Sequence, residues 1–298
     1  MADASAAPAA SSGRLAVRKT YKLYINGSFP RSESGRSYQV LSAAGQFLAN
    51  VAWASRKDVR DAVVAARKAV AAWAGSTAYL RGQVLYRAAE MLEGRREQLA
   101  ESVALAEGIS AGEALDAVGA SVDRLVWYAG WSDKIAQVAG SANPVAGPYF
   151  NFSVPEPVGV VGALAPQTSS LLGLVSVLAP VIVSGNALVV VASELRPLPA
   201  MELAEVLATS DLPPGVVNIL TGRVAELAPV LAAHRDVDAL DLAGAPDGLD
   251  ASLEEAAAGN VKRALRRQRP EPDWYAEPGT GRMLFFTETK TVWHPMGL

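Results

Sequence analysis

The chain has 298 residues, enough for one large domain or two ordinary ones, and half of them are hydrophobic, so a sizeable core can form. Lysine and arginine number 27 against 30 aspartates and glutamates, and this net charge of −3 provides no basic surface for nucleic acid. The chain has no cysteine and two histidines, which excludes disulfides, thiolate metal sites and a cysteine nucleophile within it, and disfavours a histidine metal site.

The first 18 residues are rich in alanine, serine and proline and lack the continuous apolar core of a secretory signal. They predict a disordered tail, and an address or docking peptide is the alternative. The longest apolar run, 171–183, is too short to span a bilayer. We therefore expect a cytoplasmic protein that does not enter a membrane.

Residues 19–155 predict a β-hairpin followed by helices. Strand-like alternation occurs at 21–27, which ends in the turn pair Asn26-Gly27, and again at 38–42. The stretch from Ser55 to Asp58 has the spacing of a capping box and predicts a helix start. Apolar residues then recur at helical spacing, which predicts one helix after Ser55 and two longer ones, over about 79–107 and about 112–137.

Residues 156–262 change to short apolar runs that alternate with helical segments. The runs are the strand candidates 158–164, 186–192, 216–220 and 237–243, and the helices between them are predicted at 169–183, 198–209 and 224–233. Runs without polar alternation are typical of parallel strands that helices cover on both faces. The predicted fold class is therefore α/β, with a Rossmann-like parallel sheet as a cofactor-type domain.

The rest of the chain predicts no further α/β unit. A charged helix is expected over 252–269, so the segment 263–281 combines its end with a linker rich in proline and glycine. Its arginines are expected on a solvated helix face, with a docking surface as the alternative; they are Arg263, Arg266, Arg267 and Arg269. The last segment, 282–298, predicts a strand.

Several phrases, read together, resemble the NAD(P)-dependent aldehyde dehydrogenase superfamily. They are YINGSF (24–29), PEPVGVVGALAP (155–166), LAPVIVSGNALVV (178–190), LPPGVVNILTG (212–222), HRDVDALDLAG (234–244) and ETKTVWHPMG (288–297). The resemblance covers most of the chain from 21 to 262 and its last dozen residues. It implies a Rossmann-like cofactor domain and, for 282–298, the strand of the family's oligomerisation region.

The chain departs from the family pattern at the chemical groups. The resemblance implies a catalytic cysteine in a second α/β domain, and we expect that domain to be absent here. It also implies an oxyanion-binding asparagine where Thr168 stands, a ribose-binding lysine where Val191 stands, and a general-base glutamate where Arg267 stands. The turn after the fourth strand, Gly244-Ala245-Pro246, lacks the family's hydroxyl.

The resemblance leaves three residues as remnants of a cofactor site: Glu194, Gly222 and Gly244. A solvated carboxylate and two turn glycines are their structural alternative. We therefore expect no catalytic residue, no metal and no bound cofactor, with NAD or NADP binding weakened.

The predicted function is that of a non-catalytic subunit, not an enzyme, which forms a hetero-oligomer with a full-length aldehyde dehydrogenase and stabilises or regulates it. The expected contact is a β-edge of the C-terminal segment, formed by Phe285, Phe286, Thr289, Thr291 and Trp293. An NAD(P)-binding sensor without turnover and a residual aldehyde oxidoreductase are the alternatives.

Overall fold

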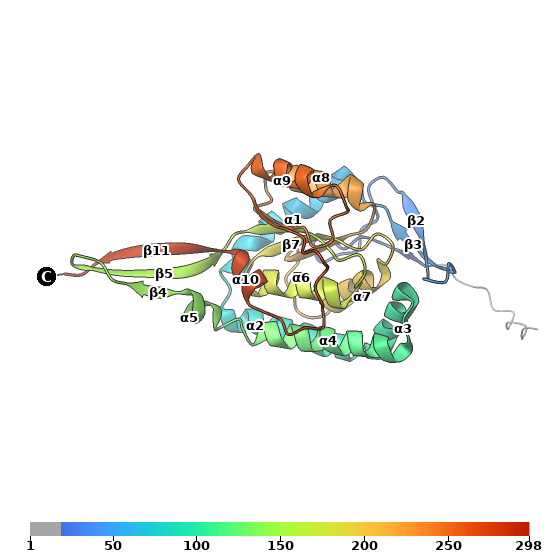
Figure 1. Ribbon diagram of the computed structural model, residues 1–298, viewed down its shortest axis with the longest axis horizontal. Coiled ribbons are helices and arrows are strands. Elements are labelled where there is room, and N and C mark those ends of the chain that lie inside the picture. Colours follow the sequence, from blue (N-terminus) through green and yellow to red (C-terminus); the bar gives the residue numbers. More distant parts are fainter. Residues whose placement is uncertain (1–18, 298) are drawn as a thin grey trace, which may run out of the picture.

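The computed structural model describes residues 19–297, so the tail predicted for 1–18 lies outside the described residues. Figure 1 shows a body in which helices surround a central sheet, and an arm of long strands that extends from one end of the body to the C-terminus. A smaller sheet lies at the opposite end of the body.

The central sheet is parallel and has five strands in the order β10-β9-β6-β7-β8. The strands are β6 (Val160–Leu164), β7 (Ala187–Val191), β8 (Val217–Leu220), β9 (Ala239–Asp241) and β10 (Arg263–Leu265). Every residue of β6 to β9 is buried, which explains why these strands are continuous apolar runs in the sequence. The predicted α/β fold with a Rossmann-like parallel sheet is confirmed.

The fifth strand, β10, corrects the helix predicted over 252–269. Helix α9 (Asp250–Ala258) ends early, and Val261, with a φ of 61°, turns the chain back toward the sheet. β10 is a short edge strand, and its charged flanking residues look like the polar face of a helix. The predicted domain boundary at 262 therefore cuts through the sheet.

Helices cover both faces of the central sheet (Figure 1). Neighbouring side chains of one strand enter different cores, as Val189 and Val190 do. One core is completed by α1 (Arg56–Ala74), α8 (Val224–Ala233) and α9. The other is completed by α2 (Ala78–Glu93), α3 (Arg96–Glu107), α4 (Ala111–Ala129), α6 (Leu172–Val183) and α7 (Leu198–Leu207).

The apolar run at 171–183 forms α6, and all residues of this helix are buried inside the protein. Its hydrophobicity therefore belongs to the core between the sheet and α4. Across residues 19–297, no helix combines the length and the apolar character needed to cross a membrane.

Two of the predicted helices are interrupted. The helix predicted over 79–107 is in fact α2 and α3, which meet at Gly94. The helix predicted over 112–137 ends as α4 before Gly130, and the short α5 (Ile135–Ala139) follows. Apolar spacing continues across both interruptions, so the pattern alone does not locate them, although each falls at a glycine, a weak helix former.

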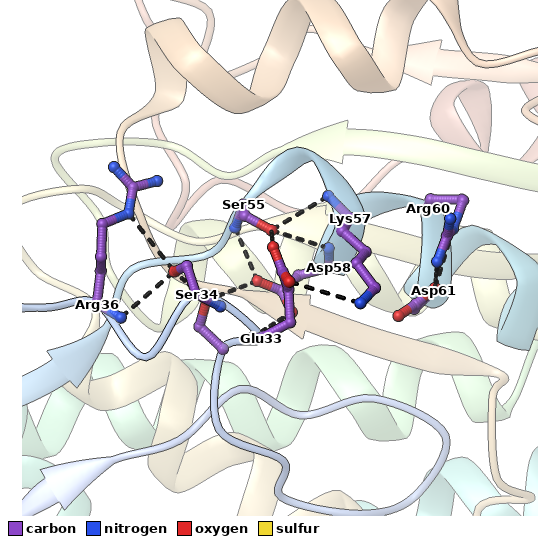
Figure 2. A network of polar contacts seen from close by, with 9 residues as sticks. Glu33, Ser34, Arg36, Ser55, Lys57, Asp58, Arg60 and Asp61 are labelled. Carbon is purple, nitrogen blue, oxygen red and sulfur yellow. Dashed lines mark hydrogen bonds and ion pairs between the residues drawn. The ribbon is translucent and has the colours of Figure 1, made fainter.

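The predicted capping box at the start of α1 is confirmed (Figure 2). The Ser55 hydroxyl accepts hydrogen bonds from the backbone N–H groups of Lys57 and Asp58, and the Asp58 carboxylate accepts one from Ser55 N at 2.8 Å. Asp58 is buried and also accepts from the Ser32 hydroxyl at 2.7 Å and from Glu33 N at 3.1 Å. One carboxylate thus fixes the preceding loop to the helix.

The N-terminal sheet has the order β1-β3-β2, formed by β1 (Thr20–Tyr21), β2 (Ser37–Leu41) and β3 (Phe47–Ala52). The predicted hairpin between 21–27 and 38–42 is wrong. β2 pairs antiparallel with β3, a strand that the sequence analysis does not predict, and β1 pairs parallel with β3. β2 therefore pairs with the next strand in the chain, β3, and not with the segment at 21–27.

The turn predicted at Asn26-Gly27 is confirmed. Both residues have positive φ angles, 53° and 70°, and the flanking residues exchange backbone hydrogen bonds of 3.0 and 3.1 Å. Beside the turn, Tyr24 exchanges backbone hydrogen bonds with Ile219 of β8. The turn therefore ties the N-terminal segment to the edge of the central sheet.

The arm in Figure 1 is a third sheet, which we call the outer sheet. It consists of β4 (Ser141–Asn143), β5 (Tyr149–Pro157) and β11 (Thr287–Pro295), antiparallel and in the order β11-β5-β4. β11 pairs with β5 along its full length, from Thr287 opposite Pro157 to Pro295 opposite Tyr149. The sequence pattern predicts β11 but neither of its partner strands.

The start of the last segment also differs from the prediction of a strand over 282–298. Helix α10 (Gly281–Phe285) comes first and includes Phe285. Phe286 follows with 0% of its surface exposed and belongs to the main core. Because the chain uses these two aromatic residues for packing inside the body, neither forms part of a strand edge.

Candidate functional site

The order of the central sheet places a candidate site between β6 and β9. From β6 the chain continues through β7 and β8 on one side, and β9 and β10 lie on the other side. In open parallel sheets, ligands bind beyond the carboxyl ends of the strands at such a reversal point. A cavity of about 180 Å³ lies there, and it is lined by Gln167, Ala243–Ala245, Asp247, Arg267–Arg269 and Glu271. We call this region the crevice.

The loop after β6 is organised by Gln167. Its side chain donates to the Ala165 carbonyl at 2.8 Å and accepts from the backbone N–H of Glu194 at 2.9 Å. The Ser193 hydroxyl donates to the carbonyl of Gln167 at 3.2 Å. Gln167 therefore joins the loops after β6 and β7, a role that sequence reasoning missed because no spacing marks it.

Glu194 lies in the loop after β7, at the same edge of the sheet. One of its carboxylate oxygens accepts from the backbone N–H of Val224, the first residue of α8, at 3.0 Å. Its backbone carbonyl accepts from the Tyr38 hydroxyl at 3.1 Å. The carboxylate therefore caps a helix, which favours a negative charge at that position.

The two glycines of the predicted cofactor site are held by close packing. Gly222 has a φ of 148°, and a side chain there would meet Leu227 at 3.1 Å. Gly244 donates to the Leu164 carbonyl at 2.8 Å, and a Cβ atom on it would lie 1.8 Å from the Ala165 carbonyl oxygen. The loops after β6 and β9 thus approach so closely that only glycine fits at 244.

Residues 266–276, which we call the strap, follow β10 and cross this edge of the sheet. Arg267 forms an ion pair with Asp247, and Arg269 forms one with Asp250 at 2.6 Å, so both arginines bind the turn that leads into α9. The hydrogen bond and charge of Arg267 hold the pKa of Asp247 below its ordinary value. These arginines therefore do not lie on a solvated helix face, contrary to the prediction.

The same correction applies to the two remaining arginines of that set. Arg263 begins β10 and donates to the Thr287 carbonyl at 2.5 Å. Arg266 pairs with Glu254 of α9 at 2.7 Å. Neither contact lies in the crevice, since neither arginine lines its cavity.

The far part of the strap is anchored to the helices. Arg124 of α4 is 8% exposed, and it donates to the carbonyls of Trp274 at 2.7 Å and Ala276 at 2.9 Å. After the strap, Arg282 of α10 forms an ion pair with Asp241 of β9, whose side chain is 1% exposed. Figure 1 shows the chain running from beside α9 toward α4 before it turns into α10.

The strap also reaches the position where the family resemblance implies an oxyanion donor. The Thr168 hydroxyl donates to the Glu271 carboxylate, with 2.8 Å to each oxygen. Nearby, the Glu107 carboxylate accepts from both the backbone N–H and the hydroxyl of Ser170, each at 2.6 Å. Polar groups at this edge are therefore paired with the protein's own carboxylates.

The outer sheet carries the remaining residues of the predicted contact. Thr289, Thr291 and Trp293 alternate along β11 and share one face. Thr291 forms a hydrogen bond of 2.9 Å with Ser153, and Trp293 packs edge-to-face on Tyr149 at 5.8 Å between ring centroids. Phe285 and Phe286 lie elsewhere, in and after α10. Of the five residues predicted for the contact, three therefore lie on β11.

Comparison with known proteins decides the family. A family model described as the aldehyde dehydrogenase family matches residues 29–266. The chain belongs to the aldehyde dehydrogenase family. This confirms the resemblance stated from the sequence.

The relatives cover most of this chain but are about twice as long. The chain is 36% identical over 245 residues to aldehyde dehydrogenase family 2 member B4, mitochondrial, of Arabidopsis thaliana. This alignment covers 81% of this chain and 45% of the Arabidopsis protein. It is 34% identical over 251 residues to mouse (Mus musculus) retinal dehydrogenase 2, and this alignment covers 82% of this chain and 48% of the mouse protein. The NAD+ complex of aldehyde dehydrogenase from Bacillus cereus superposes with a TM-score of 0.78 and 30% identity, over 83% of this chain and 50% of that one.

The prediction that the protein is not an enzyme is wrong. The relatives that match are named as aldehyde and retinal dehydrogenases, which are enzyme names. The absence of cysteine from a stretch that spans about half their length does not establish inactivity.

A dinucleotide does not fit the crevice as the strap lies. The cavity holds about 180 Å³, whereas small-molecule sites usually hold ~300–1,000 Å³. Val191 offers no amine where the family resemblance implies a lysine, and Asp247 adds a carboxylate beside Gly244, where a pyrophosphate needs donors. Within residues 19–297 there is also no group of three acidic or histidine side chains that could hold a metal ion.

Proposed function

We propose that this chain is a subunit of an NAD(P)-dependent aldehyde dehydrogenase assembly in the cytoplasm. It associates with a full-length aldehyde dehydrogenase chain and stabilises or regulates it. The observation that carries the proposal is the outer sheet, which extends from the body with two edges and exposed aromatic side chains. Its two edge strands are β4 and β11, and residues 19–297 add no further strand to either edge of this sheet.

Both faces of the outer sheet offer apolar contacts. Phe150, Phe152 and Val292 share one face, and Phe150 remains 49% exposed. On the other face, Trp293 is 59% exposed although it packs on Tyr149. Open strand edges next to exposed aromatic residues favour the addition of a strand from another chain, in which backbone hydrogen bonds and side-chain pockets act together. This combination supports a protein partner.

The chemistry of the family supports the choice of partner. Aldehyde oxidation through a covalent adduct needs a nucleophile, and the family resemblance implies a cysteine thiol for that role. These 298 residues contain no cysteine. In the proposed assembly the associated full-length aldehyde dehydrogenase chain contributes its own thiol and binds the aldehyde beside it.

The test is to capture the full chain from its native source and measure the mass of the intact complex by native mass spectrometry. We expect an aldehyde dehydrogenase chain at fixed stoichiometry, and aldehyde-dependent reduction of NAD+ or NADP+ by the captured complex. The variant Phe150→Lys places a charge on the outer sheet and is expected to release the partner. The matched control is Tyr79→Lys on α2, an aromatic residue that is 70% exposed and lies outside the three strands of the outer sheet.

The proposal is wrong if the chain is recovered alone or as a homo-oligomer. It is also wrong if Phe150→Lys retains the partner as well as Tyr79→Lys does. Circular dichroism of both variants confirms that each is folded before capture, so that loss of the partner is not loss of structure.

A further inference from the structure

We propose that a cavity at the base of the arm, which we call the base cavity, binds a small monocarboxylate through Arg81 and Ser132. A carboxylate is the oxidised form of an aldehyde, so this class of ligand includes the product of an aldehyde dehydrogenase. That link rests on the proposed function, in which this chain accompanies such an enzyme, whereas the chemistry of the base cavity stands without it.

The base cavity lies where the outer sheet joins the body, and it has a volume of about 510 Å³. The ends of α1 and α6 and the start of α2 line it from the body, and α5, β5 and β11 line it from the arm side. Figure 1 shows α5 next to the point at which the arm leaves the body. Small-molecule sites usually hold ~300–1,000 Å³, so a ligand of several carbon atoms has room here.

Arg81 supplies the positive charge of the site. Its Nε donates to the Val183 carbonyl at 3.0 Å and its Nη1 to the Ser76 carbonyl at 2.7 Å, so the guanidinium is fixed at the ends of α6 and α1. Within residues 19–297, its Nη2 has no hydrogen-bond partner and the side chain forms no ion pair. Burial lowers the pKa of Arg81, because part of its charge is removed from water without a carboxylate beside it. An anion in the base cavity would meet a donor that is already positioned.

Ser132 supplies a second donor. It lies in the turn between α4 and α5, is 6% exposed and lines the base cavity. A Cβ atom on Gly82, the residue after Arg81, would lie 2.5 Å from Ser132 Oγ, so this hydroxyl lies directly against α2. The hydroxyl forms no hydrogen bond in the part of the chain that the structure describes, although polar groups buried this deeply are usually paired. A bound carboxylate oxygen would give it an acceptor.

The rest of the lining favours a single negative charge and an apolar tail. The acidic residues Asp133 and Glu156 also line the base cavity and pair with Lys134 at 3.3 Å and with Lys290 at 2.9 Å. They would repel the second charge of a phosphate or a dicarboxylate, whereas Arg81 matches one charge. The remaining walls are apolar and suit an alkyl chain: Ala74, Ala78, Ile135, Ala136, Pro155 and Pro157.

The experiment titrates the full chain with butanoate and, separately, with butanamide, and measures binding by isothermal titration calorimetry. Butanamide has nearly the same shape as butanoate but no charge, so we expect it to bind at least about tenfold more weakly. Ser132→Ala removes a donor that has no partner within residues 19–297, so it should weaken butanoate binding about tenfold and leave the stability of the fold unchanged.

A second variant fills the base cavity. Ala136 is exposed on α5, so Ala136→Trp can place its ring in the cavity without disturbing the core and should abolish butanoate binding. The matched control is Gln137→Trp, on the same helix, exposed and outside the lining, which should bind as the wild type does. Arg81 is left unchanged, because its replacement would also release the ends of α1 and α6. Circular dichroism confirms that each variant is folded.

The site is wrong if the full chain does not bind butanoate or binds butanamide equally well. It is also wrong if folded Ser132→Ala or Ala136→Trp keeps the affinity of the wild type. Such a failure leaves the proposed function standing, because that proposal is decided by recovery of the aldehyde dehydrogenase partner. If instead the partner is not recovered, butanoate binding to this chain still decides the site, and only its link to aldehyde oxidation is lost.

Discussion

Among the carboxyl groups of residues 19–297, Glu202 has the most strongly raised pKa, and its charge should set the pH dependence of stability. Glu202 lies on α7 and is 7% exposed, and its Oε2 atom is buried without a hydrogen-bond partner in the part of the chain that the structure describes. Burial raises the pKa of Glu202 from an ordinary value of 4.5 to about 7, because a low-polarity environment disfavours the carboxylate. Between pH 4.5 and about 7 the folded protein therefore holds a proton that the unfolded chain has lost.

The size of this effect follows from the shift in pKa. Each unit is worth about 1.4 kcal/mol, so the shift corresponds to about 3 kcal/mol. Below pH 4.5 the group is protonated in both states and its full contribution to stability is present. Between pH 4.5 and about 7 the unfolded chain binds fewer protons than the folded protein, so the free energy of unfolding falls as the pH rises. Above pH 7 this group adds no further change.

The assay is urea denaturation of the wild type and of Glu202→Gln, measured at intervals from pH 5 to pH 8. The glutamine has nearly the same shape and cannot ionise, so the variant should be the more stable protein at pH 8, by about 3 kcal/mol. It should lose the decline between pH 5 and 7. Glu205→Gln is the matched control, because Glu205 lies one turn further along α7 with its side chain 35% exposed. Parallel stability profiles for the wild type and Glu202→Gln would refute the assignment.

Three further predictions concern packing and buried charge, and urea denaturation at pH 7 checks each of them. Gly244→Ala should lose about 2 kcal/mol or more, because its Cβ would lie 1.8 Å from the Ala165 carbonyl oxygen; an unchanged midpoint would contradict the close approach. Asp58→Ala should lose about 2 kcal/mol, since one donor at the start of α1 and two in the preceding loop lose their acceptor, and Asp58→Asn should lose less. Asp241→Asn should lose about 3 kcal/mol by leaving the Arg282 guanidinium unpaired near the core, and the added change Arg282→Leu should restore part of it.

Most of the parallel sheet can be read from the sequence because complete burial leaves a continuous apolar run. Strand β7, with all its residues buried, shows this most clearly. β10 gives no such signal, because it is an exposed edge of three residues that follows a charged helix. Likewise, β5 becomes recognisable as a strand only with its partner β11, more than 100 residues away in the chain. Local patterns therefore reveal buried elements and miss edges.

The candidate site is predictable in part for a related reason. Glu194, Gly222 and Gly244 meet at one edge because each follows the carboxyl end of a parallel strand. The partners of Arg267 could not be predicted in the same way. Asp247 lies 20 residues earlier in the chain, and their contact depends on where the chain goes after β10.

The departures from the family pattern are related to one another in space. Thr168 stands where the family resemblance implies an oxyanion-binding asparagine, and it donates to Glu271 of the strap. Arg267 stands where it implies a general-base glutamate, and it pairs with Asp247 at the turn before α9. Both contacts involve the strap: Glu271 of the strap accepts from Thr168, and Arg267 of the strap pairs with Asp247. The positions that depart from the family pattern and the contacts made by the strap therefore lie together at the same edge of the sheet.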